Sequence, residues 1–332
     1  MSRDHSAIIK CIAILFIMLY HLTAVAKTGI ADGAMPFYDT ILRATSSLNF
    51  FLIVTGYGVY LVYRNNRLTW RYLFKRSLKL YLGFWLVLLI FVVGIGSLMY
   101  PGRFSYKLDD LFAGFTGWRW DYCQFSWFLL PYVLMTFCSP LVFRFMDKVG
   151  NIVSFVVGMA LYLVTSWLIS RHYDNYLCSH YAVYHIVLML QTFIGLIIGA
   201  IFARLVLSGK SLQFTWLKDK SWLVLLAMVG GFILRGQIAS STLNPLFAAY
   251  MALCVVNVNW SSTSKLVLGS LGNNCMMMWF CQGFLGSVMF NEYIELLYWP
   301  PLIWLVWVIV TYIAACLLTP VSNRLAKAFK LA

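Results

Sequence analysis

His21 is the residue whose type and position point most directly to chemistry. It follows an apolar run that begins near residue 7, so on a helix it lies about 21 Å along that run. In a hydrocarbon core of about 30 Å this is past the midplane, toward the far leaflet. An imidazole with an ordinary pKa near ~6.5 can take a proton from a hydroxyl group and return it. His21 is therefore a candidate general base, or else a histidine hydrogen-bonded to a neighbouring helix.

Lys10 precedes His21 by 11 residues, close to three helical turns, so the two side chains project from one helix face about 16 Å apart. Ionisable side chains inside a membrane span are costly, and each is a functional hypothesis by default. Lys10 is a candidate partner of the catalytic site. The alternative is a lysine whose ammonium group only extends to the membrane interface.

A basic segment occupies residues 64–79. On a helix, Arg71, Lys75 and Lys79 recur every four residues and form one stripe, with Arg76 beside it. Such a stripe suits the phosphates of a nucleotide-bearing donor. It equally suits an ordinary cytoplasmic anchor against anionic lipid.

A third group is Gln124 and Trp127, where a loop enters an apolar run. The Trp127 ring could stack on a sugar, although tryptophan is also common in the aromatic belts at membrane interfaces. Among the soluble-enzyme signatures, a nucleophilic serine elbow, a phosphate-binding loop and a dinucleotide fingerprint are all missing from the sequence.

The elements that position these residues are predicted to be membrane spans. Of the 332 residues, 62% are hydrophobic and only 11% are charged, against about 25% charged in soluble domains. Apolar runs of membrane length predict an all-α polytopic protein, a single domain over residues 1–332. We predict ten spans: 7–26, 44–63, 78–99, 123–143, 151–169, 183–203, 221–236, 242–259, 266–290 and 299–319.

Basic residues predict the orientation of the spans. With both termini cytoplasmic, 18 of the 25 lysines and arginines fall in inner segments. The net charge of +14 is then a topology signal, and nucleic acid is not an expected partner.

Two features of the sequence allow alternatives. Residues 3–26 resemble a cleavable signal peptide ending in Ala24-Val25-Ala26, but Lys10 and His21 interrupt that pattern and favour a retained span. The eight cysteines show no metal-ligand spacing, so no metal is expected. Only Cys123 and Cys178 lie near outer loops, where a disulfide is one option.

Several phrases resemble the acyltransferase 3 family of bacterial integral membrane acyltransferases. The pairing of Lys10 with His21 is similar to the pattern in the family's first span. Residues 50–58 are similar to the motif in its second span. Residues 74–81 look like its basic motif, and Ser126-Trp127-Phe128-Leu129 like a phrase in its fourth span. Residues 268–274 with Trp279-Phe280-Cys281-Gln282 resemble the ninth.

The resemblance implies an O-acyltransferase of the bacterial inner membrane. It would move an acyl group, usually acetyl, from a coenzyme A thioester to a hydroxyl of a glycan at the outer face. His21 would be the base, Lys10 its paired basic residue, and Arg76 with Lys79 the basic pair that holds the donor. Lys75 is a further donor-binding candidate, and Gln124 and Trp127 are acceptor-binding candidates.

This sequence departs from the family pattern at three positions. Lys10 and Lys79 stand where arginine is common, and lysine lacks the bidentate fork of arginine. Gln282 stands where many members have histidine. A transporter or flippase of a lipid-linked glycan is the alternative from another class, although paired broken helices, the transporter signature, are not evident. A third alternative is a membrane subunit with a purely structural role.

Overall fold

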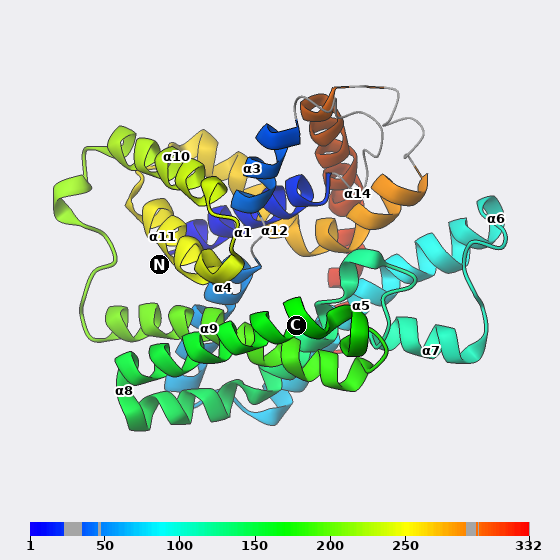
Figure 1. The fold of residues 1–332 in the computed structure, drawn as a ribbon, viewed down its shortest axis with the longest axis horizontal. Coiled ribbons are helices and arrows are strands. Elements are labelled where there is room, and N and C mark those ends of the chain that lie inside the picture. Colours follow the sequence, from blue (N-terminus) through cyan, green and yellow to red (C-terminus); the bar gives the residue numbers. More distant parts are fainter. Residues whose placement is uncertain (23–34, 46–47, 290–296, 298, 332) are drawn as a thin grey trace.

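The computed structural model describes residues 1–22, 35–45, 48–289, 297 and 299–331, and every regular element among them is a helix (Figure 1). The all-helical fold class predicted from the sequence is thus confirmed. The longer helices are α1 (Arg3–Tyr20), α3 (Met35–Thr45), α4 (Asn49–Arg64), α5 (Trp70–Leu88), α7 (Leu108–Thr116), α8 (Leu129–His172), α9 (Tyr181–Leu207), α10 (Ser221–Gln237), α11 (Asn244–Asn257), α12 (Ser262–Phe284) and α14 (Pro300–Ala328). Short segments extend or connect them: η2 (Leu89–Gly96), α6 (Ser97–Met99), η3 (Gln124–Ser126), η4 (Tyr173–Leu177), η5 (Thr215–Leu217), η6 (Ser241–Leu243) and η7 (Leu285–Met289).

Five stretches of the described chain are long and apolar enough to cross a membrane, which identifies a membrane protein as predicted. They are Tyr38–Arg64, Trp70–Met99, Gln124–Leu177, Tyr181–Leu207 and Pro300–Ala328. The shorter apolar helices α10 and α11 coincide with the predicted spans 221–236 and 242–259. The total of ten spans, the single domain and the cytoplasmic termini stay predictions. The end of the first predicted span, with Ala24–Ala26, lies outside the described residues.

Helix α8 contains two predicted spans, 123–143 and 151–169, and it folds back on itself at Gly150. That glycine has φ 82°, a left-handed conformation that other residues rarely adopt. The arm before it runs parallel to α9 and the arm after it runs antiparallel, so the two arms form a hairpin. The contacts that set these directions are Cys138 with Met189 and Met146 with Arg204 for the first arm, and Gly158 with Ile197 and Ser166 with Gln191 for the second.

Glycines let α4 and α9 approach each other closely. A Cβ on Gly56 would lie 2.2 Å from the carbonyl oxygen of Leu196, and one on Gly199 would lie 2.1 Å from that of Ile53. Gly195 and Gly199 form a G-x-x-x-G pair on α9. In lipid, close backbone packing of this kind is a main source of helix association, because burying apolar side chains there gains little.

Helices α1 and α12 are a second close pair, and they run parallel. A Cβ on Gly272 would lie 1.8 Å from the carbonyl oxygen of Ala7, while Gly283, 11 residues further along α12, and His21, 14 residues beyond Ala7, both contact Phe125. Neither helix is among the five most apolar stretches. Composition explains this, because α1 carries the charged residues Arg3, Asp4 and Lys10, and α12 carries the amides Asn273, Asn274 and Gln282.

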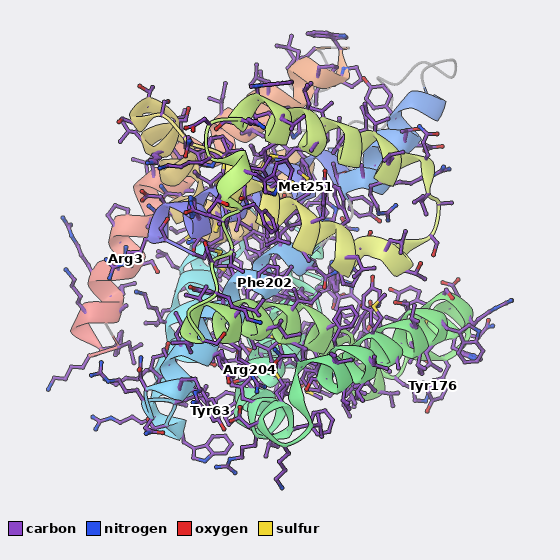
Figure 2. The ribbon with its side chains drawn as sticks, turned by 90° about the vertical axis from the view of Figure 1, so that its left-hand side faces the viewer. Arg3, Tyr63, Tyr176, Phe202, Arg204 and Met251 are labelled. Atoms are coloured by element: carbon purple, nitrogen blue, oxygen red, sulfur yellow. The ribbon has the colours of Figure 1, made fainter. Side chains whose placement is uncertain are left out.

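Segments that were predicted to lie on the inner side gather at one side of the molecule. Figure 2 shows Arg3, Tyr63 and Arg204 toward one side and Tyr176, from a predicted outer segment, toward the other. At the first side, Lys75 Nζ donates to the carbonyl oxygen of Lys330 at 2.6 Å, which joins the start of α5 to the end of α14. This bond joins two segments that were predicted to lie on the inner side, while the orientation in the membrane stays a prediction.

The segment between α6 and α8 is fixed by side-chain hydrogen bonds. Trp85 on α5 donates to the carbonyl oxygen of Phe115 at 2.8 Å. The Ser105 hydroxyl and the Arg119 guanidinium both donate to Asp110. These two bonds lower the pKa of the Asp110 carboxyl, since they stabilise its charged form. These hydrogen bonds give the segment a defined structure. Because it was predicted to lie on the outer side, we call it the outer platform.

The disulfide considered between Cys123 and Cys178 is absent. Both thiols are free, and each donates to a backbone carbonyl instead: Cys123 to Phe280 at 3.8 Å, and Cys178 to Asp174 at 3.2 Å. Cys123 is buried against α12, so its side chain points into the protein and away from the outer surface.

Candidate functional site

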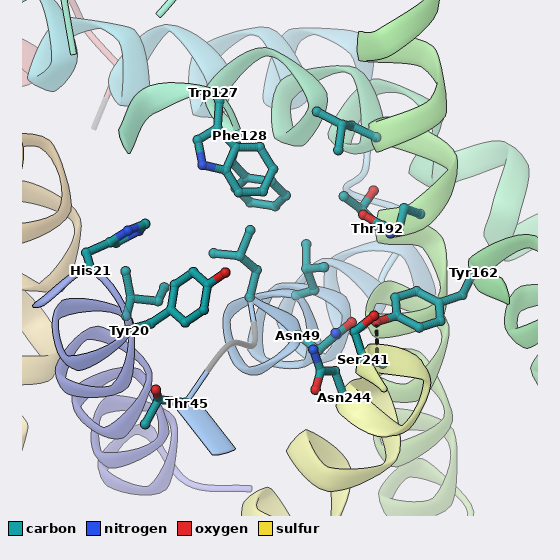
Figure 3. A pocket seen from close by; sticks show the side chains of 15 residues that line it. Tyr20, His21, Thr45, Asn49, Trp127, Phe128, Tyr162, Thr192, Ser241 and Asn244 are labelled. Carbon is teal, nitrogen blue, oxygen red and sulfur yellow. Dashed lines mark hydrogen bonds between the residues drawn. The ribbon is translucent and has the colours of Figure 1, made fainter. Parts of the chain in front are cut away.

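His21 is the C-cap residue of α1, and its ring stacks on Phe125. The ring centroids are 4.0 Å apart and the planes differ by 28°. Its backbone N–H donates to the carbonyl oxygen of Ile17 at 3.0 Å, which fixes the residue at the helix end. Within the described part of the chain, the imidazole nitrogens have no hydrogen-bond partner, and the ring lines a cavity (Figure 3). The imidazole is thus held by stacking while its nitrogens are available to a ligand.

Helix α12 positions the ring on which His21 stacks. Trp279 Nε1 donates to the carbonyl oxygen of Phe125 at 2.9 Å, and the Ser126 hydroxyl donates to the carbonyl oxygen of Cys123 at 2.7 Å. These bonds fix the short helix η3 against α12. Trp279 belongs to a quoted motif and Phe125 directly precedes another, but their role as the support of His21 depends on contacts that the sequence does not reveal.

We call the cavity beside His21 the His21 cavity; its volume is about 380 Å³. Trp127 and Phe128 form one wall, and a polar wall of hydroxyl and amide side chains lies across from His21 (Figure 3). Its described lining contains no carboxylate, lysine or arginine, so it suits a neutral polyhydroxyl ligand. The polar residues are Thr45, Asn49, Tyr162, Gln191, Thr192, Ser241 and Asn244.

A second cavity, the Arg76 cavity, contains two cations. Lys10 from α1 and Arg76 from α5 both line this space of about 330 Å³. Arg76 Nη2 donates to the Tyr132 hydroxyl at 2.9 Å, and that hydroxyl lies 3.1 Å from Thr55 Oγ1. Arg76 Nε is buried and has no hydrogen-bond partner among the residues described. The guanidinium is therefore held by Tyr132 at the wall of this cavity.

A groove leads from the Arg76 cavity past Lys79, and we call it the Lys79 groove. It has a volume of about 330 Å³, and hydroxyl and amide groups from α8, α12 and α14 line it with Ser77 and Lys79. Lys79 is exposed at this groove. Lys75 lines neither space, since its ammonium group binds the Lys330 carbonyl. Of the predicted basic stripe, Arg76 and Lys79 are thus brought together, and Lys75 is directed elsewhere.

The three spaces adjoin one another in a row, and each neighbouring pair shares wall residues. The Lys79 groove and the Arg76 cavity share Arg76, Tyr132, Asn273 and Met276. The Arg76 cavity and the His21 cavity share Ile17, Leu48 and Phe128. Along α1, Lys10, Ile17 and His21 line the Arg76 cavity, the shared wall and the His21 cavity in that order. This agrees with the expectation that Lys10 and His21 face the same way.

The two acceptor-binding candidates separate in the structure. Trp127 lines the His21 cavity, whereas Gln124 lines a different space of about 460 Å³ with Arg103, Trp120 and Asp121. Gln124 is exposed there, on the other side of the η3 segment. Trp127 is therefore the candidate that is placed to contact a ligand beside His21.

Two further polar residues are fully buried outside these cavities. The Gln282 side-chain amide is 0% exposed and has no hydrogen-bond partner within the described residues. His185 is 1% exposed, and its Nε2 bonds to the Trp118 carbonyl oxygen at 2.9 Å. His185 therefore belongs to the packing of the outer segment. The described residues contain no group of three or more histidine, cysteine or acidic side chains that could hold a metal ion.

Comparison with known proteins gives one match. A family model described as an acyltransferase domain matches residues 7–320, nearly the whole chain. No curated protein and no solved structure matches the chain.

Proposed function

The chain belongs to the acyltransferase 3 family and is a membrane acyltransferase; from that premise we propose that it is an O-acetyltransferase of the bacterial cytoplasmic membrane. Coenzyme A thioester, most simply acetyl-CoA, is the proposed donor. The proposed acceptor is a hydroxyl of an extracytoplasmic or lipid-linked polysaccharide. The observation that carries the proposal is the row of three adjoining spaces, with Lys79, Arg76 and Lys10 at one end and His21 at the other.

The donor would lie along the Lys79 groove and the Arg76 cavity. Arg76 and Lys79 would bind the phosphates of the donor, which guanidinium and ammonium groups recognise by charge-assisted hydrogen bonds. Lys10 would add a second positive charge inside the Arg76 cavity. The thioester would then point toward His21. In this arrangement the polar end of the donor stays on the cytoplasmic side.

The acceptor would enter the His21 cavity from the outer side. Its sugar ring would stack on Trp127, and the polar wall would bind its other hydroxyl groups. His21 would remove the proton of the attacking hydroxyl as that oxygen bonds to the thioester carbonyl carbon. The carbon–sulfur bond then breaks, the thiolate of coenzyme A leaves, and it takes up a proton. The products are an acetyl ester and free coenzyme A.

Sealed vesicles test both the reaction and its sidedness. Membranes that carry the protein and its host glycan are prepared inverted and right-side-out, and each is given acetyl-labelled acetyl-CoA. We expect alkali-labile label in the glycan of inverted vesicles, and in right-side-out vesicles only after detergent opens them. Glycan translocation without label would favour the flippase. Label in intact right-side-out vesicles alone would reverse the proposed orientation.

A further inference from the structure

The wall shared by the His21 cavity and the Arg76 cavity is an apolar neck of three side chains: Ile17, Leu48 and Phe128. Ile17 is 4% exposed and Phe128 is 5% exposed, while Leu48 is half-buried. Leu48 and Phe128 are the N-cap residues of α4 and α8. The neck is therefore built from the starts of α4 and α8 and from one face of α1.

The neck lies close to the proposed base. Ile17 precedes His21 by one helical turn, which corresponds to about 6 Å along the helix axis. Lys10 precedes Ile17 by two turns, about 10 Å. A ligand group that reaches His21 from the Arg76 cavity must therefore pass Ile17 just before it meets the imidazole.

The polarity of the walls changes at the neck. The Arg76 cavity offers hydrogen-bonding groups from Thr55, Tyr132 and Asn273. The neck itself contributes none, and a buried amide without a hydrogen-bond partner costs about 1–3 kcal/mol. The amides of the donor's pantetheine arm are thus best placed in the Arg76 cavity. The thioester and its acyl chain, which lack N–H groups, are the part of the donor that suits the neck.

We propose that Ile17, Leu48 and Phe128 select the acyl group by size. This inference rests on the proposed function, because it assumes a coenzyme A donor in the Arg76 cavity. A short acyl group lies within the neck, with its carbonyl toward His21. Each added methylene must displace packed side chains, and one methylene in an apolar site changes kcat/KM by about 10-fold or more. The neck therefore makes acetyl the preferred group.

The test compares acetyl-CoA, propionyl-CoA and butyryl-CoA as donors for the wild type and for Leu48→Ala. The measurement is the ratio of kcat/KM values between donors, which a general loss of folded protein does not change. We expect the preference for acetyl over butyryl to fall at least about 10-fold in Leu48→Ala. Ile17→Val, which removes one methyl group, should shift the ratio in the same direction by a smaller factor. Leu61→Ala, the same change on α4 at a residue that lines none of the three spaces, should keep the wild-type ratio.

The opposite change sharpens the test. Leu48→Phe fills the neck and should reduce acetyl transfer while the KM for acetyl-CoA changes little. If the ratio of kcat/KM values between donors is unchanged in both Leu48→Ala and Ile17→Val, the neck does not select the acyl group. The proposed function would be unaffected by that result. A wild-type protein that transfers no acyl group from any of the three thioesters would instead contradict the proposed function.

Discussion

The His21 cavity and the Arg76 cavity meet at one neck but differ in charge and in construction. The Arg76 cavity has two cations and no carboxylate in its described lining, whereas the His21 cavity has hydroxyl and amide groups and no lysine or arginine. A donor with several phosphates matches the first, and an uncharged sugar matches the second. The contrast teaches that two adjoining cavities can separate two substrates by electrostatics, with an apolar wall between them.

The largest expected effect is the loss of both cavities when α1 and α12 are forced apart. A Cβ on Gly272 would lie 1.8 Å from the Ala7 carbonyl oxygen, far inside any real contact. Gly272→Ala should therefore destabilise the protein by at least the ~1–3 kcal/mol typical of overpacking. The thermal midpoint in detergent and the folded yield measure this. Gly269→Ala is the matched control on the same helix, because a Cβ there meets nothing within 4 Å. Equal behaviour of the two variants would contradict the close pairing.

The next largest effect is expected on donor binding alone, which distinguishes the role of the Arg76 cavity from that of the His21 cavity. Arg76→Ala removes a buried, hydrogen-bonded charge and should raise the KM for acetyl-CoA by about 10-fold or more. The KM for the acceptor should change little, since Arg76 does not line the His21 cavity. Lys75→Ala is the matched control: it removes the neighbouring positive charge, which binds the Lys330 carbonyl outside the cavities. If both variants raise the KM for acetyl-CoA equally, donor binding depends on overall positive charge and not on the Arg76 cavity.

The smallest effect concerns the outer platform, which lies apart from both cavities. The Asp110 carboxyl has a lowered pKa because Ser105 and Arg119 donate to it. A lowered pKa in the fold contributes stability above the ordinary carboxyl pKa of about 4, and this contribution is lost as the pH falls through the lowered value. The wild type should be slightly more stable than Asp110→Asn at pH 7, and the difference should shrink on acidification. Thermal midpoints of both proteins across the acidic range check this, and a difference that grows as pH falls would contradict it.

Features that depend on spacing or hydropathy within a single helix could be predicted from the sequence. Lys10 and His21 share a face because their spacing matches whole helical turns, and hydropathy located the two arms of α8 on either side of Gly150. The sequence did not predict which way adjacent residues turn. Lys75 and Arg76 are neighbours with the same charge, yet packing against α8 and α14 directs one to a carbonyl at the surface and the other into a cavity.

Features built from distant segments were also beyond the sequence. The polar wall of the His21 cavity combines side chains from α4, α8, α9 and α11, and no short motif joins them. Phe125 supports His21 only because Trp279 holds its carbonyl oxygen. Gln124 and Trp127, three residues apart, were grouped by the sequence and separated by the fold. Helices α1 and α12 fall outside the most apolar stretches because of the charged and amide side chains that they carry.

The most direct test of the account is acyl transfer by His21→Gln. The amide of glutamine can hydrogen-bond to an acceptor hydroxyl, but it cannot take its proton. If His21 is the general base, kcat for acetyl transfer should fall by about 10²-fold or more, with the KM for acetyl-CoA and the folded yield close to those of the wild type. A His21→Gln variant that retains transfer within a few-fold of the wild type would show that His21 is not the base.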